Sequence, residues 1–167
     1  MIENVTAEAC AAFALETERA GAELYQGLAR RFAADGELRE LFERLGQDEV
    51  QHGEQVRSLG ERLVPRFRER PVSAEERDYL RAMSMADAFA GPGGAPADLG
   101  GIRSREDALR RALNLEKATL AYYRALRDVA GPEEILDSLV AMERKHVVKV
   151  MAALVTEAMM HALAESA

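Results

Sequence analysis

Apolar residues recur at helical spacing along four long stretches of the chain, and alternating β-branched residues are almost absent. Asp35-Gly36 is a turn signal between the first two stretches. Pro65 should end the second stretch because proline cannot continue a helix, and Pro132 suits the first position of the fourth. The pattern therefore predicts an all-α protein with helices at about 6–34, 37–64, 104–130 and 132–164.

The connection between the second and third helices, residues 65–103, differs in composition. It begins with a stretch rich in proline and arginine and ends with Gly-Pro-Gly-Gly-Ala-Pro at 91–96. We expect it to contain one short helix at about 73–90. With about 39 residues it is too long to join adjacent antiparallel helices, but it can return along a bundle about 40 Å long. We therefore predict one domain, residues 1–167, in which a long crossover joins two helical hairpins.

The two predicted hairpins repeat one another. The first helices match at an offset of 98 residues and the second helices at an offset of 94, so the difference falls in the hairpin turn. Each half has a glutamate, a tyrosine seven positions later, and then a Glu-x-x-His pair in its second helix. The matched residues are Glu18 and Glu116, Tyr25 and Tyr123, Glu49 and Glu143, and His52 and His146.

This repeat predicts a metal centre. Residues three or seven positions apart share a helix face, so four carboxylates and two imidazoles should point into one core at mid-height. Without metal, four buried negative charges would repel one another and most would have to be protonated. Two divalent cations would cancel them. The predicted ligands are Glu18, Glu49, His52, Glu116, Glu143 and His146.

The roles of these residues follow from their positions. Glu49 and Glu143 should bridge the two metals, because they share helices with the histidines, and the other two glutamates should be terminal ligands. Tyr25 and Tyr123 are candidates for orienting the carboxylates of the opposite half, although they could equally be ordinary core aromatics. Oxygen and imidazole ligands suit iron or manganese, and zinc is a possible substitute.

Composition excludes several other classes of protein. A formal net charge of -7 argues against a nucleic-acid surface, which needs clustered basic residues. A single cysteine, Cys10, excludes an internal disulfide, a thiolate zinc site and a rubredoxin centre. No apolar run approaches the roughly 20 residues of a membrane span, and the first residues do not have the form of a signal peptide, so a cytoplasmic location is expected.

In the Glu, Glu-x-x-His, Glu, Glu-x-x-His set the chain resembles the ferritin-like superfamily and, within it, the rubrerythrin-like proteins. The resemblance implies a four-helix bundle with two iron ions, which react with hydrogen peroxide or dioxygen while Fe(II) is oxidised. It also implies a separate electron-donor protein, because the chain has no rubredoxin domain. Thr119 stands where peroxidase-type relatives carry a further ligand glutamate, and Val50 stands where bacterioferritins carry the methionine that binds haem. Haem is therefore not expected.

Three functions fit these observations. The first is a di-iron oxidoreductase that uses peroxide or dioxygen, in the manner of proteins that respond to oxidative stress. The second is an iron-binding ferroxidase or storage protein with no separate substrate, and the third is a structural bundle stabilised by its metal. We also expect a homo-oligomer, with a dimer favoured. His161 has no glutamate three positions before it and is assigned to the surface or to packing.

Overall fold

The computed structural model of the chain describes residues 5–85 and 99–165, and within these ranges it contains helices and no strand. The all-α class predicted from the sequence is therefore confirmed. The helices are α1 (Ala7–Arg31), α2 (Gly36–Glu69), α3 (Ala74–Ser84), α4 (Arg105–Ala130) and α5 (Glu134–Glu165). Among the described residues, no helix combines the length and the apolar character that crossing a membrane requires.

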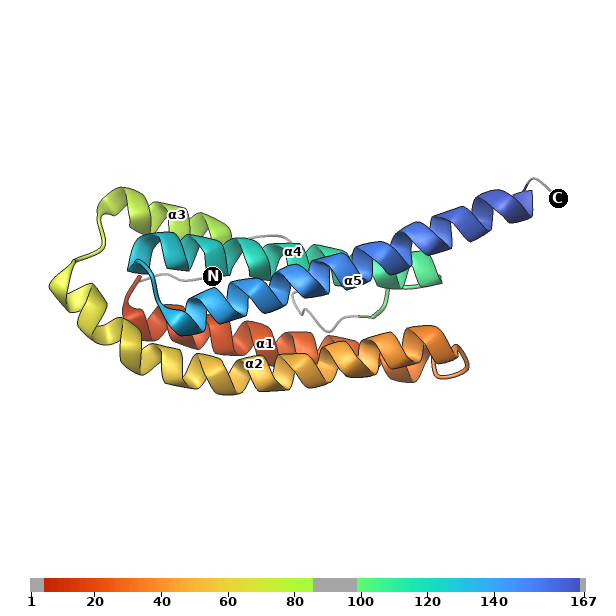
Figure 1. Ribbon diagram of the computed structural model, residues 1–167, viewed down its shortest axis with the longest axis horizontal. Coiled ribbons are helices and arrows are strands. Elements are labelled where there is room, and N and C mark those ends of the chain that lie inside the picture. The colour runs from red at the N-terminus through yellow and green to blue at the C-terminus, as the bar shows by residue number, and fades with distance from the viewer. Residues whose placement is uncertain (1–4, 86–98, 166–167) are drawn as a thin grey trace.

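The four long helices form two antiparallel pairs. Helix α1 packs along α2, and α4 packs along α5, while the short α3 lies against α4 (Figure 1). Helix α5 extends past the ends of the other helices (Figure 1). The predicted short helix at 73–90 corresponds to α3, and its last predicted residues, 86–90, lie outside the described residues.

Side chains before the helices satisfy the free N–H groups of their first turns. The Thr6 hydroxyl accepts a hydrogen bond from Ala9 N, and the Asp35 carboxylate accepts one from Leu38 N. Before α4, the Ser104 hydroxyl accepts from Asp107 N. Helix α4 ends at Ala130 and is followed by Gly131, whose φ of 80° lies in the region that glycine adopts without strain. These local signals place the helix boundaries.

Two predictions about proline were wrong. Helix α2 does not end before Pro65 but continues to Glu69, because Leu63 and Phe67 on either side of the proline pack into the core. Tertiary packing outweighs the hydrogen bond that proline removes. Pro132 also does not open the last helix, which begins at Glu134. The buried Glu133 carboxylate takes the capping role instead, accepting hydrogen bonds from the N–H groups of residues 135 and 136.

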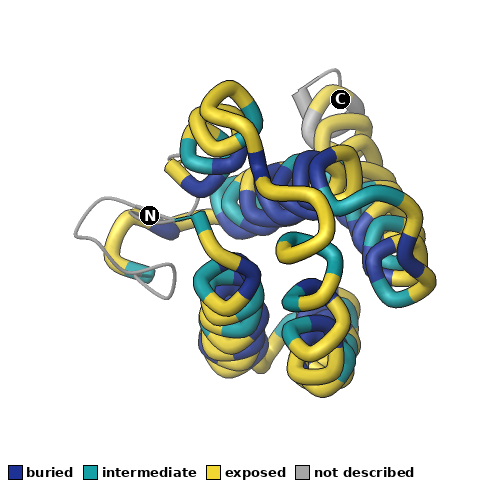
Figure 2. The backbone as a smooth tube through the Cα atoms, turned by 90° about the vertical axis from the view of Figure 1, so that its left-hand side faces the viewer, coloured by how far each residue is buried: buried dark blue, intermediate teal, exposed yellow. Residues whose placement is uncertain are grey.

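The apolar core has two parts, separated along the bundle. Figure 2 shows that the buried residues lie on the helix sides that face one another. One cluster includes Val56, Leu59, Leu126 and Leu139. The other lies towards the α1–α2 turn and includes Leu24, Leu28, Phe42, Leu109 and Val150. Along each long helix, the predicted glutamates and histidines fall between residues of the two clusters, so the polar layer is enclosed by apolar packing above and below.

Candidate metal centre

The structure brings the six predicted ligands together in this layer between the two apolar clusters. Helix α1 supplies Glu18, α2 supplies Glu49 and His52, α4 supplies Glu116, and α5 supplies Glu143 and His146. None of the six exposes more than 4% of its surface. Burial of so many ionisable groups is costly unless each is paired or binds a metal.

The imidazole of His52 faces three carboxylates. Its Nδ1 atom lies 2.9 Å from Glu143 Oε1, 3.3 Å from Glu18 Oε2 and 3.4 Å from Glu49 Oε2. Glu49 lies on the same helix as His52, Glu18 lies on α1 of the same hairpin, and Glu143 lies on α5 of the other hairpin. The imidazole nitrogen and three oxygens therefore converge on one small volume.

The imidazole of His146 has a matching environment. Its Nδ1 atom lies 3.3 Å from Glu116 Oε2, 3.6 Å from Glu49 Oε1 and 4.0 Å from Glu143 Oε2. The two imidazole rings are stacked, with centroids 5.0 Å apart. Glu49 and Glu143 thus each direct one oxygen towards one histidine and the other oxygen towards the second histidine.

Several polar atoms of this layer have no hydrogen-bond partner among the described residues. A buried polar atom without a partner costs about 1–3 kcal/mol, and native interiors rarely contain such groups together. All of them point into the shared volume. The atoms are Glu18 Oε2, His52 Nδ1, Glu116 Oε2, both oxygens of Glu143, and His146 Nδ1.

These atoms fit a metal-binding role. Glu49, His52, Glu143 and His146 each offer one ligand atom within 4.8 Å of the others, and together they could hold a metal ion. Carboxylate oxygen and imidazole nitrogen are ligands for divalent first-row metals. A cation in the volume between these atoms would interact favourably with the oxygen and nitrogen atoms that have no hydrogen-bond partner.

Two tyrosines form hydrogen bonds with Glu18 and Glu116, and each tyrosine lies on the hairpin opposite to its glutamate. The Tyr25 hydroxyl donates to Glu116 Oε1, and the Tyr123 hydroxyl donates to Glu18 Oε1. Each bond leaves the second oxygen of that glutamate facing a histidine. Burial, followed by the charge of the neighbouring glutamate, raises the pKa of both tyrosines well above its usual value, so the phenols stay protonated and act as donors. The predicted orienting contacts are therefore present.

The electrostatic interactions among these six side chains favour bound protons. Burial, followed by repulsion from Glu49, raises the pKa of Glu18 and of Glu143 well above its usual value. Burial alone would lower the pKa of His52, but the facing carboxylates outweigh it and raise that pKa to about 12. The same balance raises the pKa of His146 to about 10. Metal binding must therefore displace protons.

Asp48 is a functional candidate that the sequence reasoning missed. His146 donates from Nε2 to Asp48 Oδ2 at 3.1 Å, and Lys149 Nζ lies 3.2 Å from the same oxygen. A carboxylate on the outer nitrogen fixes the orientation of a ligand imidazole and makes it a stronger donor. The matching residue in the second hairpin, at the offset of 94, is Met142, which offers no carboxylate. The signal in the sequence was the aspartate directly before the first Glu-x-x-His pair.

Two other predicted features have different outcomes. Thr119 is buried in α4, one turn after Glu116, and its side chain cannot supply the further carboxylate ligand. His161 lies within α5, but its side chain lies outside the described residues. The assignment of this histidine to the surface or to packing therefore stays a prediction.

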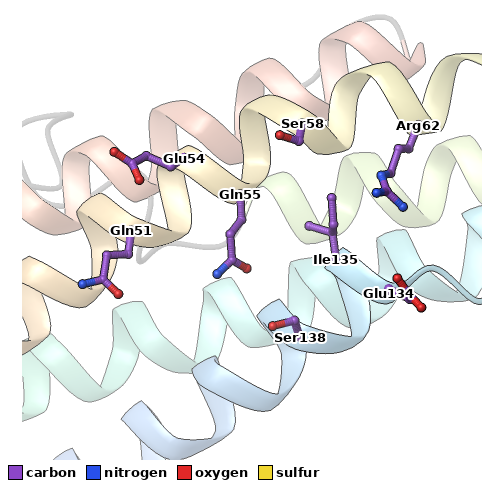
Figure 3. A pocket seen from close by; sticks show the side chains of 8 residues that line it. All are labelled: Gln51, Glu54, Gln55, Ser58, Arg62, Glu134, Ile135 and Ser138. Carbon is purple, nitrogen blue, oxygen red and sulfur yellow. The ribbon is translucent and has the colours of Figure 1, made fainter.

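Two of the hollows beside α2 lie close to the level of the predicted ligands. The larger, about 750 Å³, is a surface groove between α2 and the start of α5 (Figure 3), and none of the six predicted ligands lines it. Its lining residues are mostly polar, namely Gln51, Glu54, Gln55, Ser58, Arg62, Glu134, Ile135 and Ser138. The other, about 470 Å³, lies between α1 and α2, and Glu18 and Glu49 form part of its lining. Of these two hollows, the second is the one whose lining includes predicted ligands.

No family model, curated protein or solved structure matches this chain.

Proposed function

We propose that this protein is a ferritin-like, rubrerythrin-type di-iron oxidoreductase, which binds two iron ions in the six-residue layer and reduces hydrogen peroxide or dioxygen. Electrons would come from a separate donor protein. The observation that carries this proposal is the arrangement of Glu49 and Glu143, each of which directs one oxygen towards each histidine. That is the orientation a carboxylate needs to bridge two metals.

The remaining ligands divide into two equivalent sets. Glu18 and His52 would hold one ion, and Glu116 and His146 the other, with the two bridging glutamates shared. Four carboxylates then carry a charge of -4, which two divalent ions neutralise. This set of ligands is the pattern of ferritin-like di-iron and di-manganese carboxylate proteins.

Two bound ferrous ions would supply two electrons, which with two protons would reduce hydrogen peroxide to two waters. The surrounding residues hold the ligands in place. Tyr25 and Tyr123 fix the orientation of the terminal glutamates, and Asp48 fixes that of His146. The apolar clusters on both sides limit the access of bulk water to the layer. Thr119 leaves the ligand set at six residues, so we propose that oxidation does not depend on a seventh carboxylate.

The test is the oxidation of iron by the loaded protein. Apoprotein is titrated with Fe(II) without oxygen, and the product is mixed with hydrogen peroxide or dioxygen in a stopped-flow instrument. We expect two irons per chain and oxidation faster than that of the same iron in buffer. The Glu49→Ala/Glu143→Ala double variant should lose this rate while retaining helical circular dichroism, whereas Glu54→Ala on the outer face of α2 should retain the rate.

Other outcomes would reject the proposal. Bound di-iron that reacts no faster than free iron would exclude a redox enzyme. Uptake of many irons per chain on repeated additions would favour iron storage. Loss of helical structure in the metal-free parent protein would favour a structural role for the metal.

A further inference from the structure

The hollow between α1 and α2 extends from the exposed Arg19 to Glu18 and Glu49, at one edge of the layer of predicted ligands. Its volume is about 470 Å³, and Glu18 and Glu49 contribute to its lining. Leu15, Ala22 and Val50 give it apolar walls, and its other charged lining residues are Glu16, Arg19 and Arg57. It is therefore large enough for a small molecule to approach two of the predicted ligands without passing through the apolar clusters.

Small side chains keep this hollow open. Gly53 lines it from α2 and Ala22 from α1. A Cβ atom added at Gly53 would lie 3.6 Å from Leu15 Cδ1 and 3.8 Å from Glu18 Cβ, which are ordinary contact distances. Alanine would therefore fit at position 53 without displacing its neighbours. A longer side chain would have to extend into the hollow.

The internal repeat shows that the other hairpin is different. At the matching positions, α5 has Val147 in place of Gly53, and α4 has Leu120 in place of Ala22. Leu120 is buried, and Val147 packs against the second apolar cluster. The predicted ligands are the same in the two halves. The small residues that border the hollow in the first half are replaced by larger ones in the second half. The two hairpins therefore differ in the space available between their helices beside the predicted ligands.

We propose that the α1–α2 hollow is the entrance through which a small uncharged oxidant reaches the metals, at the edge formed by Glu18 and Glu49, and that Gly53 keeps this entrance open. The proposal rests on the proposed function, since it assumes that iron binds in the layer. It goes beyond that function by assigning the access route to one hairpin only.

The experiment compares variants at position 53 by their binding of nitric oxide, a probe similar in size to dioxygen that binds ferrous iron. Protein loaded with Fe(II) without oxygen is mixed with nitric oxide, and the binding rate is followed by absorbance. Gly53→Leu fills the hollow, whereas Gly53→Ala does not. Glu54→Leu places the same side chain on the neighbouring residue, which lines the polar groove instead (Figure 3).

We expect Gly53→Leu to slow nitric oxide binding by about tenfold or more, because a packed route admits the probe only when the protein opens locally. Gly53→Ala and Glu54→Leu should stay within about twofold of the parent rate, since neither closes the route. Ala22→Leu fills the same hollow from α1 and gives an independent measurement if Gly53→Leu does not fold. The number of irons bound per chain must equal that of the parent, which shows that the ligands have not moved.

Parent-like binding of nitric oxide in Gly53→Leu or Ala22→Leu with a full complement of iron would overturn the proposed entrance. Slow iron oxidation in the parent protein would reject the proposed function, while the nitric oxide comparison would still test the entrance. Absence of iron binding would reject both. Repeating the comparison with hydrogen peroxide and with dioxygen shows which oxidant uses the route, because only that oxidation should slow in the leucine variants.

Discussion

Metal-free protein should lose stability as the pH rises from 6.5 to 8.5. In the folded state the pKa of His52 is raised to about 12 and that of His146 to about 10, compared with 6.5 for an ordinary histidine. Over this range the folded protein keeps two protons that the unfolded chain releases. The stabilisation is complete below pH 6.5 and is lost as the pH rises towards the folded pKa values.

The magnitude follows from proton linkage. Each such proton changes the free energy of unfolding by about 1.4 kcal/mol per pH unit, so two imidazoles contribute about 4 to 5 kcal/mol over the range. Glu18 and Glu143 act with the same sign, because their raised pKa values also make the folded state hold more protons. Domains are stable by about 5–15 kcal/mol, so the loss would be a large fraction of the total.

The assay is denaturant unfolding of chelator-treated protein, followed by circular dichroism at pH 6.5, 7.5 and 8.5. Metal-loaded protein should not show the fall, since the metal replaces the protons. The His52→Gln/His146→Gln double variant should show a much smaller dependence on pH. A free energy of unfolding that stays constant or rises between pH 6.5 and 8.5 in the metal-free parent would refute the reasoning.

Three further predictions concern single side chains. Asp48→Asn should weaken metal binding by about 10- to 100-fold in competition with a chelator, because His146 loses its orienting carboxylate; an unchanged affinity would contradict this role. Tyr25→Phe leaves Glu116 Oε1 without its hydrogen-bond donor. It should lower the free energy of unfolding of the metal-free protein by about 1–3 kcal/mol in denaturant titrations. No change would show that water replaces the hydroxyl. Leu59→Ala should cost about 2–5 kcal/mol in the same assay with unchanged metal stoichiometry, whereas altered stoichiometry would mean that the apolar cluster also positions the ligands.

The local part of the site was predictable because it depends on helix geometry alone. Residues three and seven apart project from one side of a helix wherever that helix packs. The spacing of Glu49 and His52, and its repeat in the second hairpin, therefore indicated which side chains share a face. The error at Pro65 had the opposite cause. Whether α2 continues through Pro65 depends on Leu63 and Phe67, which pack into a cluster built from several helices.

The sequence by itself determined the approximate positions of the four long helices, the repeat and the candidate ligands. Helices and the residues that share a helix face follow from periodicity within one segment, and the repeat follows from comparing the two halves. Only the tertiary structure decided which residues meet across helices. It showed that Asp48 contacts His146, and that a hollow lies beside Gly53, where the other hairpin has Val147. The physical reason is that such contacts depend on the register and spacing of packed helices, which arise from many side chains together.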